Sequence, residues 1–118
     1  MKKTMTAWET LQTFCNAWFE RRDPEEVYSY LDDDICFVGT GEDESAHSPQ
    51  EMREYLERDI QEIPEPFRVE LTLFQEQKIH EDTHNLSVGI LLKNTQYRWR
   101  LRGFFTMVRP RESWRLRT

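Results

Sequence analysis

Three stretches of the chain carry side chains whose types and spacing could do chemistry, and the most specific is a zinc-like motif. His80, Glu81 and His84 spell H-E-x-x-H. In zinc proteases this spacing places both histidines on one helix face, with the glutamate as base. The intervening Asp-Thr and the following Asn are poor helix formers, and strand-like runs flank the segment. A hairpin turn is therefore expected, with no metal site.

The second stretch is Gly39-Thr40-Gly41, followed by three acidic residues, 42–44. Phosphate cradles need further glycines, a lysine and a helix N-terminus, and the acids here would repel phosphate. Two interpretations stay open. The stretch is either a flexible loop that follows the strand and has no function of its own, or the rim of a pocket, where the Thr40 hydroxyl or the Glu44 carboxylate contacts a ligand.

The third is Asp59, which ends the apolar stripe of a predicted helix. In a pocket, such an acid could have a raised pKa and act as a general base, helped by Tyr55 or His80. Alternatively it is a solvated acid at a helix end, or the partner of an arginine. An enzyme hypothesis for this chain rests on Asp59.

Aromatic residues offer surfaces for a ligand or for the core. Trp99, with Tyr97 and Phe105, alternates with three arginines, so the aromatic and basic side chains are expected on opposite faces of one strand. An earlier helical stripe contains Trp18 and is interpreted as core or as pocket wall; its members are Trp8, Leu11, Phe14, Cys15, Trp18 and Phe19. The outward residues would be Arg98, Arg100 and Arg102.

The elements that must position these residues are marked by helix caps and by alternation. Helix starts are predicted at Thr6, Asp23 and Ser48, the last two followed by proline; the second helix ends near residue 31 and prolines 64 and 66 end the third. Strands are predicted over 35–40, 67–79, 86–92, 97–107 and 114–117. The order of three helices with one short strand among them, followed by long strands, predicts an α+β fold.

Composition sets further bounds on a single domain of 118 residues. The net charge is −6, yet residues 93–118 hold 8 basic residues and 1 acidic one. Because these arginines alternate with apolar residues and the rest of the chain is acidic, self-association or internal pairing is favoured and nucleic acid is not expected as a partner. Asp32–Asp34 is read as a solvated turn, and Cys15 and Cys36 as buried, reduced thiols. Without a leader or an apolar span, a cytoplasmic protein with no membrane contact is expected.

The order of elements resembles the nuclear-transport-factor-2-like superfamily, particularly its SnoaL-like branch. The resemblance covers nearly the whole chain and rests on Trp18-Phe-Glu-Arg-Arg-Asp-Pro24, Phe37-Val-Gly-Thr-Gly41, Tyr55-Leu-Glu-Arg-Asp59, Phe105-Thr-Met-Val108 and Trp114. It implies a cone in which a curved antiparallel sheet packs against three N-terminal helices around a pocket, the cystatin-like arrangement.

The resemblance also implies function. It points to a bacterial ligand-binding, sensory or association domain that needs no cofactor, binds an apolar or aromatic small molecule, and dimerises through the sheet face. The implied ligand-binding residues are Trp18, Phe37, Thr40, Glu44, Tyr55, Trp99 and Phe105. The alternative is a small cofactor-free lyase, isomerase or hydrolase that uses Asp59. Relatives usually continue past the final Trp-x-x-x, so residues 1–118 are either one domain with a short last strand or the N-terminal part of a longer signalling protein.

Overall fold

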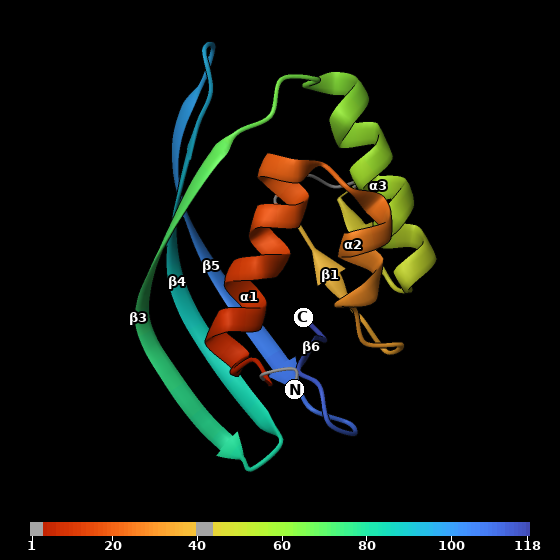
Figure 1. Cartoon of the computed structure of the whole chain (residues 1–118), viewed down its shortest axis with the longest axis vertical. Coiled ribbons are helices and arrows are strands. Elements are labelled where there is room, and N and C mark those ends of the chain that lie inside the picture. Colours follow the sequence, from red (N-terminus) through yellow and green to blue (C-terminus); the bar gives the residue numbers. More distant parts are fainter. Residues whose placement is uncertain (1–3, 40–43) are drawn as a thin grey trace.

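The computed structural model describes residues 4–39 and 44–118, and within them three helical segments precede a long curved sheet (Figure 1). The helical elements are α1 (Ala7–Cys15), which continues as a π-helix (Asn16–Arg21), α2 (Pro24–Ser29) and α3 (Pro49–Glu62). The strands are β1 (Phe37–Val38), β2 (Ser45–Ala46), β3 (Arg68–His80), β4 (Thr83–Lys93), β5 (Arg98–Val108) and β6 (Arg115–Leu116). The predicted α+β class is confirmed.

All three predicted helix starts are confirmed, because local side chains satisfy the first free amides. Thr6 and Glu9 form a complete capping box, in which each side chain bonds the other residue's backbone N–H. The Asp23 and Ser48 side chains accept from amides of the following turn, with Pro24 or Pro49 at the first helical position. The chain therefore enters each helix at a position that the sequence specifies.

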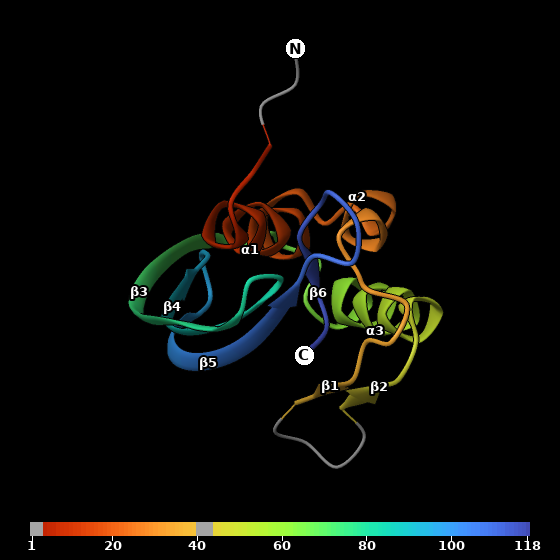
Figure 2. The same ribbon diagram turned by 90° about the horizontal axis from the view of Figure 1, so that it is seen from below.

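Strands β3 to β6 form one antiparallel sheet in sequence order, while β1 and β2 pair as a separate ribbon. The inner face of the sheet turns toward α1, and the ribbon projects from the body beside α3 (Figures 1 and 2). Cross-strand register places Leu86, Val88, Ile90 and Leu92 on the inner face, where all four are buried. With helix residues such as Leu11 and Leu56 they form one continuous core.

The short strand β6 ties the sheet to the segment between α2 and β1. Leu31 forms a parallel bridge with Leu116, and the Asp32 amide donates to the Leu116 carbonyl at 2.9 Å. Asp32 is buried, and its carboxylate accepts from Arg117 Nε at 3.1 Å. The expectation of a solvated turn over residues 32–34 is therefore wrong for Asp32, whose partner lies 85 positions away.

Two further expectations are corrected. The strand predicted over 35–40 is shorter, because Ile35 turns inward into the core and only Phe37 and Val38 pair with β2. Cys15 is buried as expected, but Cys36 is exposed because it lies on the outward side of the ribbon. No helix in residues 4–39 and 44–118 has the length and apolar character needed to cross a bilayer.

Candidate functional site

Asp59 lies near the C-terminal end of α3, and two donors engage its carboxylate. Its Oδ2 atom accepts from Trp18 Nε1 at 3.2 Å and from Arg22 Nη1 at 3.4 Å. Trp18 comes from the π-helix, so the contact joins elements 41 residues apart. Asp59 was interpreted as a general base, a solvated acid or the partner of an arginine, and the contact with Arg22 fits the last of these.

Arg22 was not singled out from the sequence, yet it organises this corner of the fold. It ends the π-helix in the left-handed backbone region, at φ 53°. Its side chain is only 6% exposed, and Nη2 donates to the carbonyls of Asp59 at 3.1 Å and Ile63 at 2.6 Å. It thus caps the end of α3, where carbonyls lack helical partners. A left-handed arginine has no sequence signature.

Tyr55 lies one turn before Asp59 and connects several predicted ligand residues. Its ring centroid is 5.6 Å from that of Trp18 and 5.4 Å from that of Phe37. Burial raises the pKa of Tyr55 to about 12, and the negative charges of Glu44, with which it shares a hydrogen bond, and Asp59 add to this shift. The phenol therefore stays protonated at neutral pH and remains a hydrogen-bond donor.

The remaining predicted ligand residues lie on or beyond the sheet. Trp99 belongs to a second aromatic cluster, with Tyr97 at 4.8 Å and Phe67 at 5.4 Å between ring centroids. Phe105, further along β5, is half-buried against the core. Thr40, on the Gly-Thr-Gly stretch, lies outside the described residues. The structure therefore brings together Trp18, Phe37, Glu44, Tyr55 and Asp59, and sets Trp99 and Phe105 on the inner sheet face.

That inner face is covered unevenly. Trp99 and Leu101 share it with their cross-strand partners Leu92 and Ile90. Trp99 is 38% exposed and Leu101 is 45% exposed, whereas Leu92 is 2% exposed. Apolar side chains pointing inward are normally covered by the layer opposite. This end of the inner face is thus an apolar surface that the helices leave partly open.

The H-E-x-x-H motif forms a hairpin, as expected. His80 ends β3, His84 lies on β4, and His84 Nδ1 is 2.7 Å from Glu76 Oε2. Within the two described ranges, no group of three or more His, Cys, Asp or Glu side chains could hold a metal ion. The β3–β4 hairpin lies at the opposite end of the molecule from the C-terminal end of α3 (Figure 1), so His80 and Asp59 do not share a site.

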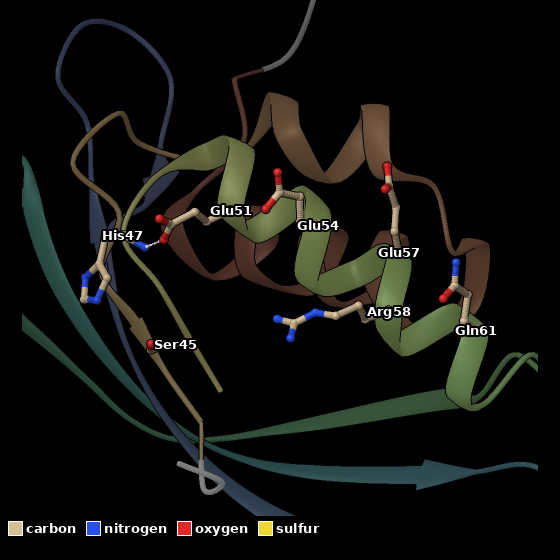
Figure 3. A pocket seen from close by; sticks show the side chains of 7 residues that line it. All are labelled: Ser45, His47, Glu51, Glu54, Glu57, Arg58 and Gln61. Atoms are coloured by element: carbon tan, nitrogen blue, oxygen red, sulfur yellow. Dashed lines mark hydrogen bonds between the residues drawn. The ribbon is translucent and has the colours of Figure 1, made fainter. Parts of the chain in front are cut away.

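A depression of about 640 Å³ lies on the outer side of α3, and sequence reasoning missed it (Figure 3). It is bordered by the ribbon on one side and by successive turns of α3 on the other. Its lining is mostly charged: Ser45, His47, Glu51, Glu54, Glu57, Arg58 and Gln61. The three glutamates recur every third residue, which is a helical spacing that the sequence analysis had not read as a face.

Comparisons with known proteins bear on the fold as a whole. A putative calcium/calmodulin-dependent protein kinase type II association domain from Thiobacillus denitrificans superposes with a TM-score of 0.79 at 13% identity, covering 99% of this chain and 94% of that chain. An NTF-2 like protein of unknown function from Shewanella oneidensis gives 0.74 at 11% identity, covering 93% and 90%. A Mycobacterium tuberculosis LEH-like epoxide hydrolase gives 0.60 at 16%, covering 93% and 80%.

These similarities establish the fold, which proteins with different roles share. The comparison with curated proteins gives no match. The family profile of the SnoaL-like domain matches residues 8–117, nearly the full length of the chain. The architecture of this chain, helices followed by a curved antiparallel sheet, agrees with that of its NTF2-like and cystatin-like structural neighbours. The chain therefore belongs to the SnoaL-like domain family, within the nuclear-transport-factor-2-like superfamily.

Proposed function

We propose that this protein is a small-molecule-binding domain that holds an apolar or aromatic ligand against the inner face of its sheet and performs no reaction on it. The observation that carries the proposal is the exposure of Trp99 and Leu101 on the inward side of β5. When a ligand covers inward apolar side chains that are in contact with water, the free energy falls by about 25 cal/mol for each Å² of apolar surface that is buried.

Two aromatic clusters give this surface its chemistry. The Trp18–Tyr55–Phe37 rings continue from the π-helix to β1, and the Phe19–Phe67–Trp99 rings continue from the next π-helix residue to β5. Since Trp18 and Phe19 are consecutive, both clusters originate at the same turn. Aromatic rings of this kind suit a flat apolar ligand.

The contacts of Asp59 support binding without chemistry. A general base needs a carboxylate that can reach a substrate proton, but Oδ2 of Asp59 already accepts from Trp18 and Arg22. The same two donors fix the end of α3 to the π-helix. We therefore assign Asp59 a structural role, and the enzyme hypothesis remains the alternative.

The test uses two substitutions on one strand that point to opposite faces. Leu101→Asp places a charge on the inner face and should abolish binding of an apolar fluorescent dye such as anilinonaphthalene sulfonate. The quenching of tryptophan emission that accompanies dye binding should be lost as well. Phe104→Asp, three residues away on the outer face, should leave dye binding intact. Equal binding by the Leu101 variant and the unmodified protein would refute the inner-face site.

The alternative is tested by turnover. The unmodified protein and Asp59→Asn would be incubated with epoxide and ketosteroid substrates and the products followed by chromatography. Turnover that disappears in Asp59→Asn, while the variant keeps its native circular dichroism, would replace the binding proposal with the enzyme hypothesis.

We propose further that the domain is a homodimer joined through the outer sheet face. Phe74 is 64% exposed and Phe104 59% exposed, and both lie on or beside that face. The Phe74 ring lies over Gly89, where no side chain intervenes, so the surface is flat at this point. Exposed aromatics on a flat face are typical of an interface. Sedimentation should give a dimer for the unmodified protein and a monomer for Phe104→Asp; a monomer for both would refute the interface.

A further inference from the structure

Strand β5 lies at an edge of the main sheet over most of its length. The sheet order is β3-β4-β5-β6, and β6 pairs only with Met107 and Val108 of β5. Figure 2 shows β6 beside the C-terminal end of β5. From Arg98 to Phe105, no other strand of residues 4–39 and 44–118 pairs with the side of β5 that faces away from β4.

The backbone bonds at the two ends of β5 show which of its residues face β4. The Asn94 amide donates to the Tyr97 carbonyl at 2.9 Å, and the Arg109 amide donates to the Asp82 carbonyl at 2.9 Å. Residues 82 and 94 flank β4, and the register between the two strands has no shift. Since backbone groups alternate in direction along a strand, the odd-numbered residues of β5 bond toward β4.

The even-numbered residues of β5 direct their backbone groups to the free edge. Thr106 shows this direction, because its amide donates to the Thr118 carbonyl at 3.0 Å, on the side of β6. The backbone groups of Arg100, Arg102 and Phe104 point the same way, and no group in the described part of the chain bonds them. Three alternate positions are therefore open to a further strand.

The two edges of the sheet differ in regularity. The opposite edge, β3, has two register shifts with β4, and such bulges twist a strand and interrupt further pairing. In contrast, β5 pairs with β4 from residue 98 to residue 108 without a shift. Of the two edges, β5 is therefore the one that can accept an added strand.

The side chains along this edge alternate between two kinds. Arg98, Arg100 and Arg102 are exposed on the outer face, and none of them forms an ion pair with a described residue. Trp99 and Leu101 are partly exposed on the inner face. Two copies joined through their β5 edges would bring arginines opposite one another, which is unfavourable. The edge instead suits a strand with acids on its outer side and apolar residues on its inner side.

We propose that the β5 edge binds an extended segment of a partner protein as an added antiparallel strand, and that this segment alternates acidic and apolar residues. Its acidic side chains lie opposite Arg100 and Arg102, and its apolar side chains lie beside Trp99 and Leu101. Backbone hydrogen bonds supply the affinity, and the alternation supplies the specificity. The proposal shares two side chains with the ligand surface proposed above, but it depends on the backbone edge and the arginines, so it does not require a small molecule to bind.

The first test measures binding of a short fluorescently labelled peptide in which valine alternates with glutamate, followed by anisotropy. The peptide should bind the unmodified protein, and its affinity should fall near 1 M salt, where the screening length is about 3 Å. A matched peptide with lysine in place of each glutamate should bind about tenfold more weakly or less, because its charges face the arginines. Equal binding of the two peptides would overturn the proposal.

Two N-methylated versions of the glutamate peptide separate strand addition from simple charge attraction. In an antiparallel pair, a glutamate opposite Arg100 or Arg102 directs its N–H toward β5, whereas the valines direct theirs away. N-methylation of the glutamates should therefore weaken binding about tenfold, and N-methylation of the valines should leave it within about twofold. The proposal is overturned unless the version methylated at glutamate binds more weakly.

Hydrogen exchange measured by NMR locates the added strand. The amides of Arg100, Arg102 and Phe104 should exchange rapidly in the free protein and about tenfold more slowly with the glutamate peptide bound. The amides of Leu101 and Gly103 bond toward β4 and should be protected in both states. Peptide binding without this alternating protection would overturn the proposal.

A variant of the protein keeps this proposal separate from the small-molecule function. Arg100→Glu should weaken binding of the glutamate peptide about three- to tenfold, because like charges then lie opposite one another. It should leave binding of a neutral apolar dye such as Nile red unchanged, because position 100 faces away from the inner side of the sheet. Unchanged peptide affinity in Arg100→Glu would refute the strand-addition site, whereas absence of dye binding would refute only the small-molecule function.

Discussion

Replacing Arg22 with alanine should lower the free energy of unfolding by about 3 kcal/mol. The side chain is almost fully buried and donates to three acceptors: the Asp59 carboxylate, the Asp59 carbonyl and the Ile63 carbonyl. Its loss leaves those groups at the end of α3 without their donor. The change tests whether this arginine holds α3 to the π-helix.

The magnitude follows from the contacts. A hydrogen bond from a charged donor contributes about 1.5–3 kcal/mol net, so the two shorter bonds, to the carbonyls of Asp59 and Ile63, contribute about 4 kcal/mol together at about 2 kcal/mol each. Against that, Arg22 Nε is buried with no partner among the described residues, so truncation also removes a cost of about 1 kcal/mol. Arg22→Gly should be about 0.5–1 kcal/mol more stable than Arg22→Ala, because glycine adopts a φ of 53° without strain.

Urea denaturation followed by circular dichroism measures these differences. The matched control is the neighbouring Arg21→Ala. Arg21 also forms an ion pair, with Glu26 at 2.6 Å, but its side chain is 46% exposed, so the expected loss is below about 1 kcal/mol. Equal losses at positions 21 and 22, or no difference between the alanine and glycine variants at position 22, would refute the reasoning.

Further predictions concern the sheet glycines and Tyr55. A Cβ at Gly103 would meet the packed Phe105 ring, so Gly103→Ala should cost about 1–3 kcal/mol in urea denaturation. At Gly89 it would meet only the end of the exposed Phe74 ring, which can swing away, so Gly89→Ala should stay within about 0.5 kcal/mol; equal costs would contradict this contrast. Because folding raises the pKa of Tyr55 to about 12 from about 10, its contribution is complete below pH 10 and is lost between about pH 10 and 12. Over that range the unmodified protein should lose about 1 kcal/mol more than Tyr55→Phe, after allowance for partial exposure, and parallel pH profiles would contradict the assignment.

Features fixed by local chemistry could be predicted from the sequence. The caps at Thr6, Asp23 and Ser48 satisfy amides within the next few residues, so their effect depends on nothing distant. Alternation along β3 as far as Leu73, where a register shift interrupts it, and along β5 likewise gave the correct inner and outer faces, because the period of a regular strand is two. The helix caps and the strand alternation together were enough to predict the α+β fold.

Features fixed by distant contacts could not be predicted. The helical spacing of the first stripe is compatible with an ordinary α-helix, yet residues 16–21 widen into a π-helix that ends at Arg22. Asp32 resembles its two acidic neighbours in sequence, and only Arg117 distinguishes it. At the candidate site, the aromatic members were predicted, but Arg22 was not, because its role depends on a buried position and a rare backbone conformation.

The bond between Asp32 and Arg117 has a consequence for synthesis of the chain. The helices and the β3–β4 hairpin precede residues 115–117 in the chain and are therefore synthesised before them. Until then, Asp32 has no guanidinium partner, and the amides of Asp32 and Cys36 lack the carbonyls of Leu116 and Arg117 that they bond in the finished fold. A chain in which residues 115–117 have not yet docked should therefore stay open between α2 and β1, and this long-range contact should form late in folding.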